Sequence, residues 1–186
     1  LYNYYNKTSH FDKKSPDFDV LSEDPKKTAT ILKETLQDSG YENIKIFKKP
    51  GIGEVIAPHY EVVYGNDSIV YIYKPLACHN YNVIKLNNLN IKVATIDTIM
   101  SFYLAFIFSS RKYYDHNRIY CMAQFLFNTQ NFNRLKQKGL LKRFGYVCYG
   151  NQTTIQDIRS FKSQKFKEFK ELKSSGKFDL DEYEKY

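Results

Sequence analysis

The first clearly patterned segment of the chain is Asp17-Phe18-Asp19-Val20-Leu21, in which acidic and apolar residues alternate. Successive side chains of a β-strand point to opposite faces, so this alternation predicts a half-buried strand. Its apolar side chains would face the core. Its two carboxylates would share the opposite face.

A helix and several further strands are predicted after this segment. Asp24-Pro25 places a helix-capping residue before a proline at the first helical position, and helical spacing then continues to Asp38, before Gly40. Strands are predicted at 43–47, 55–64, 69–73 and, over a shorter run, 91–94. Gly65-Asn66-Asp67 separates the second and third of these strands and is typical of a hairpin turn.

The second half of the chain has the periodicity of helices. Thr95 is a suitable N-cap for a helix that continues to Ile107, and more helix is predicted over 113–130. A last amphipathic helix is predicted from Thr153 or Thr154 to about Ser174. This order predicts an α+β fold with one mixed sheet. We expect a core domain over 1–94 and a helical basic region, packed on that core, over 95–186.

The chain is basic, with a formal net charge of +8 and an isoelectric point near 9.2. The excess is concentrated between Arg134 and Lys177, and it favours a polyanionic partner. Aromatic residues at 144–149 could stack on single-stranded bases beside these charges. The residues predicted to contact RNA are Arg143, Arg159, Lys162, Lys165 and Lys170. The alternative is a solvated amphipathic helix whose lysines keep the protein soluble.

The cysteines and the apolar segments indicate in which cellular compartment the protein is expected. Cys78, Cys121 and Cys148 are an odd number without paired spacing, so we expect reduced thiols in an intracellular protein. The longest apolar stretch, 96–108, is well short of the ~18 residues that a membrane span needs. It predicts a buried helix, and no membrane is expected among the partners.

Asp17 and Asp19 are the residues whose pattern predicts chemistry. Two carboxylates at positions i and i+2 of a strand point the same way, about 6.5–7 Å apart along it, and can converge on divalent cations. Mg²⁺ prefers such oxygen ligands and completes its shell with phosphate oxygens and water. In two-metal catalysis, one ion activates the attacking 3′-hydroxyl and the other holds the triphosphate. The alternative for an isolated Asp-x-Asp is an ordinary turn or a solvent-facing strand edge.

Longer segments of the chain are similar to a known family. Tyr-Asn-Tyr-Tyr-Asn at 2–6 and Ser-Pro-Asp-Phe-Asp-Val-Leu-Ser at 15–22 resemble the catalytic block of viral poly(A) polymerases. The relevant members are the catalytic subunits from large cytoplasmic DNA viruses, the mimivirus-like ones in particular. Further similarity runs through 71–75, 94–105 and 148–153, so the resemblance covers nearly the whole chain.

The resemblance implies a polymerase β-like nucleotidyltransferase domain that uses Mg²⁺ or Mn²⁺ and adds adenylate from ATP to the 3′ ends of mRNA. Asp17 and Asp19 match the two metal-binding aspartates of the family, which serve catalysis. The resemblance also implies a homodimer or a partner subunit, and a location in the host cytoplasm, at the viral factory, or in the virion. Adenine preference is implied by the resemblance alone.

Two positions depart from the family pattern. The Gly-Gly or Gly-Ser turn that grips the nucleotide phosphates has no counterpart shortly before Asp17, so we expect the chain to begin after it and to be weak or inactive alone. The third carboxylate is replaced by Tyr71, which is not an anion at neutral pH because the usual pKa of tyrosine is ~10. Glu61 or Asp67 substitutes for it, or the domain is catalytically impaired. Our hypothesis is that Glu61 is the third metal ligand.

Three functions therefore stay open. The first is a template-independent polynucleotide adenylyltransferase that tracks RNA with its basic C-terminal surface. The second is a catalytically degenerate module of the same fold that binds RNA or a partner subunit, as Tyr71 suggests. The third is a plain basic RNA-binding or interaction domain in which Asp17 and Asp19 are structural. Within the enzyme class, a toxin-like or nucleotide-modifying nucleotidyltransferase is the alternative.

Overall fold

The computed structural model of the chain describes residues 17–52, 55–111, 114–143 and 145–176. The segment 2–6, residues 15–16 of the resemblance and residue 113, where a helix was expected to begin, lie outside the described residues. The chain divides into two compact units, Leu1–Gly150 and Asn151–Tyr186, so the predicted boundary after residue 94 falls within the first unit. Within these described ranges, two sheets and four α-helices make the fold α+β, as the sequence predicted.

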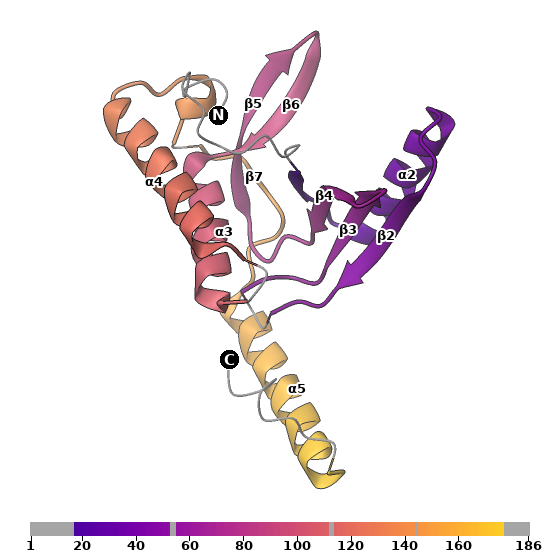
Figure 1. Cartoon of the computed structure of the whole chain (residues 1–186). Helices are drawn as coiled ribbons and strands as arrows, with labels where there is room; N and C mark the ends of the chain where they lie inside the picture. The colour runs from indigo at the N-terminus through magenta and orange to yellow at the C-terminus, as the bar shows by residue number, and fades with distance from the viewer. Residues whose placement is uncertain (1–16, 53–54, 112–113, 144, 177–186) are drawn as a thin grey trace. The chain divides into compact units, whose positions relative to one another are not determined.

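Four strands form the larger sheet, which has the order β1-β4-β3-β2 (Figure 1). The strands are β1 (Phe18–Leu21), β2 (Ile44–Lys49), β3 (His59–Tyr64) and β4 (Asp67–Tyr73). β1 runs parallel to β4, whereas β3 is antiparallel to both of its neighbours. All four correspond to predicted strands, but Phe18 and Val20 on β1 are exposed, so the expectation that these apolar side chains face the core is wrong. β3 begins only at His59 because the preceding Pro58 has no N–H to donate to a ladder.

Helix α2 (Pro25–Asp38) covers one face of this sheet (Figure 1). It begins as predicted: the Asp24 side chain accepts a hydrogen bond of 3.0 Å from the Lys27 backbone N–H, and Pro25 takes the first helical position. The core between the helix and the sheet is made of Ala29, Ile44, Val62, Val70 and Ile72. The buried part of this face is apolar, whereas Asp19, Tyr71 and Glu61 project from the opposite face.

Helices α3 (Ile96–Ser109) and α4 (His116–Phe132) pack beside that opposite face. Thr95 caps α3 as predicted, since its hydroxyl accepts a hydrogen bond from the Thr98 backbone N–H. The second core cluster joins the sheet to these helices and contains Ile52, Ile56, Tyr73, Phe106 and Ile119. A short 3-10 helix, η1 (Gly139–Leu141), adds Leu141 to a third cluster with Ile96 and Leu126.

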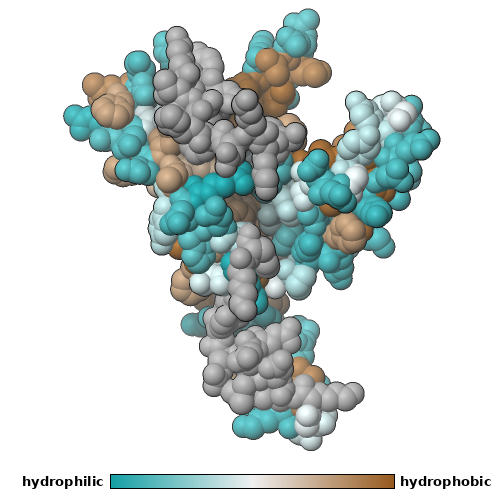
Figure 2. All heavy atoms as spheres, in the orientation of Figure 1, coloured by the Kyte–Doolittle hydropathy of each residue, from teal (hydrophilic) through white to brown (hydrophobic). Residues whose placement is uncertain are grey.

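A second sheet of three strands was not predicted, and the expectation of a single sheet is wrong. Its order is β6-β5-β7, with β5 (His79–Leu86), β6 (Leu89–Ala94) and β7 (Cys148–Tyr149). Asn87 and Asn88 turn the chain between β5 and β6 with φ of 46° and 66°, the pair of positive values that a two-residue hairpin requires. Figure 2 shows hydrophobic side chains exposed on this hairpin, which are Val83, Leu86, Leu89 and Ile91.

Two of the three cysteines are joined, so the expectation that all three are reduced thiols is wrong. Cys78 and Cys148 form a disulfide with a Cα–Cα distance of 5.2 Å, within the usual range for such a bond. Cys78 directly precedes β5, whereas Cys148 is the first residue of β7 and is opposite Asn80 on β5. Cys121 keeps its thiol and is exposed. The disulfide therefore fixes β7 to the start of β5.

The second unit consists, in its described part, of helix α5 (Ile155–Ser174). Thr154 and Asp157 form a capping box at its start, in agreement with the predicted beginning at residue 153 or 154. None of the described residues 151–176 is buried. Over the part of the chain that the structure describes, no helix has the length and apolar character needed to cross a membrane.

Candidate functional site

Asp19, Tyr71 and Glu61 form a row across three adjacent strands of the larger sheet. Asp19 on β1 is opposite Tyr71 on β4, and Tyr71 is opposite Glu61 on β3. Opposed residues of neighbouring strands project on the same side of a sheet, which here is the side away from α2. Tyr71 therefore stands where the sequence placed it, next to Asp19 on the neighbouring strand, and it separates the two carboxylates.

The Glu61 carboxylate is fully engaged by its neighbours. Lys49 Nζ lies 2.8 Å from Oε2, and the Tyr71 hydroxyl donates a hydrogen bond of 3.0 Å to Oε1. The Ser68 hydroxyl also donates to Oε1. Burial alone raises the pKa of Glu61, but the hydrogen bonds from these three residues outweigh it and hold the pKa below its ordinary value. Glu61 is thus a charged, buried anchor for Tyr71 and Lys49.

The Asp19 carboxylate has a different environment. It accepts a hydrogen bond from the Tyr73 hydroxyl, two residues beyond Tyr71 on β4. Desolvation, followed by the negative charge of Asp17, raises the pKa of Asp19 from 3.8 to about 6, although the Tyr73 hydrogen bond and the charge of Arg118 act in the other direction. Asp19 is an anion that its surroundings do not fully compensate. Such a group favours the approach of a cation.

Asp19 opens into a hollow of about 330 Å³ between β1 and the second sheet. The side chain is therefore accessible to solvent, while protein atoms around the hollow still displace enough water to raise its pKa. The residues that line the hollow are Asp19, Val20, Leu21, His79, Asn80, Tyr81, Lys92, Ala94 and Tyr149. The hollow thus brings the Asp-x-Asp strand together with residues far away in the sequence.

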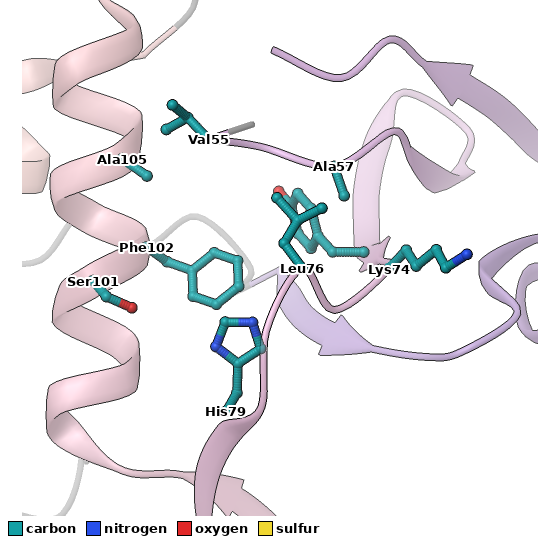
Figure 3. Close-up of a pocket in the computed structure, with 9 residues that line it drawn as sticks. Val55, Ala57, Lys74, Leu76, His79, Ser101, Phe102 and Ala105 are labelled. Atoms are coloured by element: carbon teal, nitrogen blue, oxygen red, sulfur yellow. The ribbon is translucent and has the colours of Figure 1, made fainter. Parts of the chain in front are cut away.

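A second cavity, of about 220 Å³, lies between β4, β5 and α3 (Figure 3). Figure 3 shows the rings of His79 and Phe102 side by side in it, and their centroids are 5.3 Å apart. Burial lowers the pKa of His79, so the imidazole is neutral at pH 7. Among the described residues, His79 Nε2 is buried without a hydrogen-bond partner. The lining is mostly apolar and contains no carboxylate, and it shares Tyr73 and His79 with the surroundings of Asp19.

The structure brings some of the predicted site residues together and separates others. Asp17 lies close enough to Asp19 to affect its pKa, as the predicted carboxylate pair requires. Glu61 lies on the same face but beyond Tyr71, and the described residues hold no group of three or more histidine, cysteine or acidic side chains suited to a metal ion. Asp67 lies at the turn end of β4. The assignment of Glu61 as a metal ligand stays a prediction.

The predicted RNA-binding residues occupy two places. Arg143 lies in the first unit, where its guanidinium is 3.5 Å from the Asp97 carboxylate. The other four, Arg159, Lys162, Lys165 and Lys170, all lie on α5. On this helix Lys165 and Lys170 stack over Phe161 and Phe166, with ammonium-to-centroid distances of 5.0 and 4.8 Å. Contact with RNA stays a prediction for all five.

Sequence reasoning missed Tyr73, Lys92 and Tyr149 as parts of the site. Tyr73 had a signal, since it follows the predicted third-carboxylate position by two residues and therefore shares its face. Lys92 and Tyr149 line the hollow because they belong to the second sheet, which the sequence did not predict. Arg118 on α4 also acts on the site, because its charge lowers the pKa of Asp19.

Comparison with known proteins adds no relative. No protein-family model matches the chain, and no curated protein matches it by sequence. The function is therefore argued from the site itself and from the resemblance of the segments described above.

Proposed function

We propose that the protein is a metal-dependent nucleotidyltransferase that adds adenylate from ATP to RNA 3′ ends. The observation that carries the proposal is the Asp19 carboxylate, raised in pKa beside Asp17 and open to a hollow. The resemblance of segments 15–22 and 94–105 to viral poly(A) polymerases supports the same activity and supplies ATP as the substrate. The polymerase β-like form of the α+β fold belongs to this proposal.

The donor set fits a hard divalent cation. Asp17 and Asp19 offer carboxylate oxygens, which Mg²⁺ and Mn²⁺ prefer. A bound cation would also offset the repulsion between these two carboxylates. Glu61 could join the set only by giving up its contacts with Lys49, Ser68 and Tyr71. The remaining ligands would come from substrate phosphates and water. The cation, when bound, supplies charge stabilisation and a more acidic 3′-hydroxyl.

The residues of the chain would perform four tasks. Asp17 and Asp19 bind the cation, and the Tyr73 hydroxyl fixes the orientation of the Asp19 carboxylate. Glu61 holds the Tyr71 hydroxyl away from Asp19, so that the phenol does not occupy that carboxylate. The hollow in front of Asp19 receives the reacting group. The basic residues of α5 attract the RNA, with their phenylalanine neighbours available for stacking on bases.

The test is calorimetric titration of the metal-stripped protein with Mn²⁺ and ATP. We compare the native chain with Asp17→Asn, with Asp19→Asn and with the control Asp38→Asn, which removes an exposed acid at the end of α2. We expect each of the first two to weaken Mn²⁺ binding by about tenfold or more, because each removes a charged ligand, and the control to bind normally. Equal Mn²⁺ affinity in all four proteins would overturn the proposal.

The transfer step is measured as incorporation of ATP onto an oligo(A) primer by the longest natural form of the protein. Extension that is lost in Asp17→Asn and Asp19→Asn, and kept in Asp38→Asn, is the expected result. A second candidate function, the catalytically degenerate binding module, is favoured by Tyr71 in place of an acid opposite Asp19. That candidate predicts RNA binding without extension and without any dependence on Mn²⁺.

A further inference from the structure

We propose that Lys92, together with Tyr81 and Tyr149, forms a binding subsite for the phosphate chain of a nucleotide in the hollow in front of Asp19. The three side chains line the hollow from β6, β5 and β7, while Asp19 lines it from β1. The inference rests on the proposed function in one respect, because it takes Asp19 as the cation-binding end of the same ligand.

Lys92 is held by two aromatic rings. Its Nζ lies 5.1 Å from the ring centroid of Tyr81 and 5.7 Å from that of Tyr149, within the range of cation–π attraction. Across the described part of the chain, no carboxylate forms an ion pair with Lys92. The rings fix the position of the ammonium group without neutralising its charge. A fixed, unneutralised ammonium at the wall of a hollow is suited to a phosphate oxygen.

Tyr149 is fixed in place by several independent contacts. The adjacent Cys148 is bonded to Cys78, and Tyr149 itself pairs with His79 on β5. The Tyr149 hydroxyl oxygen accepts a hydrogen bond of 3.1 Å from the Glu23 backbone N–H, so its own proton remains available for donation. This hydrogen bond also ties the loop after β1 to the second sheet. Tyr149 can therefore offer an O–H donor to an anion beside Lys92.

Gly150, the residue after Tyr149, is tightly packed against the segment before β5. Gly150 has a φ of +98°, and a Cβ at this position would collide with the Ala77 carbonyl oxygen and would come within 2.7 Å of the Pro75 Cβ. Only glycine fits both the backbone conformation and the space. Together with the disulfide, this contact holds Tyr149 at the wall of the hollow, and a rigid wall lowers the cost of ordering a ligand there.

The two ends of the hollow carry opposite charges, Asp19 at one end and Lys92 at the other. Asp19 repels a phosphate unless a cation is bound to it, whereas Lys92 attracts one directly. A polyphosphate bridges the two ends, since one phosphate can contact the ammonium group while another shares the cation with the aspartates. A single phosphodiester of RNA satisfies only one end. The polyphosphate of a nucleotide is therefore the ligand that we assign to the subsite.

The experiment measures binding of sodium tripolyphosphate, ATP and an oligo(A) RNA to the full chain by calorimetry, each with and without Mn²⁺. The variants are Lys92→Met, which keeps an apolar stem over the two rings, and Lys92→Arg, which restores the charge. Lys85→Met, an exposed lysine on β5 outside the hollow, is the matched control for net charge. Tyr149→Phe removes only the hydroxyl and serves as a second variant. Thermal unfolding confirms that each variant is folded.

We expect Lys92→Met to weaken binding of tripolyphosphate and of ATP by about tenfold or more, as loss of a charge-assisted contact does. Lys92→Arg should stay within about threefold of the native chain, and Lys85→Met should be unchanged. Tyr149→Phe should weaken both ligands by about threefold. Unchanged affinity in Lys92→Met overturns the inference, and so does a loss confined to oligo(A).

The two proposals fail separately. If Lys92→Met loses tripolyphosphate binding while Asp17→Asn and Asp19→Asn leave Mn²⁺ binding unchanged, the phosphate subsite stands and the transferase proposal falls. If the aspartate variants lose Mn²⁺ while Lys92→Met binds ATP and tripolyphosphate normally, the transferase proposal stands and the subsite is wrong.

Discussion

The Tyr71 hydroxyl donates a hydrogen bond of 3.0 Å to Glu61 Oε1, although Tyr71 is also directly opposite Asp19 on the other side. Tyr71 thus lies between the Asp19 and Glu61 positions, and its hydroxyl donates to Glu61. Desolvation raises the pKa of Tyr71, and the nearby charge of Glu61 raises it further, so the hydroxyl remains a donor at every physiological pH. The third acidic position expected of a nucleotidyltransferase is here filled by a neutral donor.

Glu61→Gln tests whether this carboxylate is structural. We expect the free energy of unfolding to fall by about 1–3 kcal/mol, because Lys49, Ser68 and Tyr71 lose the charged acceptor that the buried Glu61 provides. Urea unfolding measures this loss, and Glu42→Gln on the surface is the control. Mn²⁺ affinity should change by less than about threefold. A large loss of Mn²⁺ affinity with unchanged stability would instead make Glu61 a metal ligand.

Asp19→Asn should stabilise the metal-free protein at pH 8. The pKa of Asp19 is about 6 when folded and 3.8 ordinarily, so the folded protein gains a proton between these values and loses stability as pH rises through them. Because the side chain is partly hydrated, we expect ~1 kcal/mol, or about 2–4 °C in the unfolding temperature. The gain should shrink as pH falls below 6 and vanish only below about pH 3.8, where Asp19 is protonated in the folded and the unfolded protein alike. Equal unfolding temperatures at pH 8 would refute the raised pKa.

Tyr71→Asp should tighten Mn²⁺ binding by about tenfold. It places a third carboxylate opposite Asp19, and ligand charge is a main determinant of divalent cation affinity. The same change should reduce stability, because it removes the hydrogen bond to Glu61 and adds a like charge beside it. Tyr71→Phe is the control and should leave Mn²⁺ affinity unchanged. No gain in Tyr71→Asp would mean that Asp17 and Asp19 do not face a common cation.

Reduction of the Cys78–Cys148 disulfide should lower the free energy of unfolding by about 2–5 kcal/mol, since the bond closes a loop with a sequence separation of 70 residues. Urea unfolding with and without a phosphine reductant measures the effect. Cys121→Ser should respond to the reductant as the native chain does, because Cys121 takes no part in the bond. If the reductant leaves the free energy of unfolding of the native chain unchanged, the two thiols are not bonded in solution.

Thr154→Ala should reduce the helicity of α5, measured by far-UV circular dichroism, with a cost of ~1 kcal/mol to the helix. Described residues 151–176 include no buried side chain, so local capping is a large part of what stabilises this helix. Gln152→Ala, which precedes the cap, should have no such effect. Equal helicity in both variants would contradict this role of the capping box.

Local signals predicted much of the fold. Helices were expected to start at Asp24, at Thr95 and at Thr153 or Thr154, and the structure has caps at Asp24, Thr95 and Thr154, because a cap depends only on the few residues beside it. β5 was missed although Asn87-Asn88 lies between two alternating runs, a pattern typical of a hairpin. Its many asparagine and lysine residues, which are poor strand formers, obscured the alternation.

The site was predictable only in part, because most of its contacts join residues that are far apart in the sequence. Asp17 and Asp19 could be paired because they are two residues apart on one strand. The role of Glu61 depends on the register of three strands, and the Cys78–Cys148 bond depends on how two distant segments meet. Neither register nor contact is encoded in spacing along the chain. Lys92 joined the site for the same reason, through a sheet that the sequence did not reveal.

β1 lies at an edge of its sheet within the described part of the chain, and this has a consequence for self-association. An edge strand offers unpaired backbone groups to any other strand, and charged side chains on it discourage such pairing. Asp19 on β1 and Asp17 directly before it supply that charge, while Phe18 and Val20 beside them are exposed. Neutralising both aspartates would therefore leave a short apolar edge free to join another sheet. The same two carboxylates therefore oppose edge-to-edge pairing of the larger sheet.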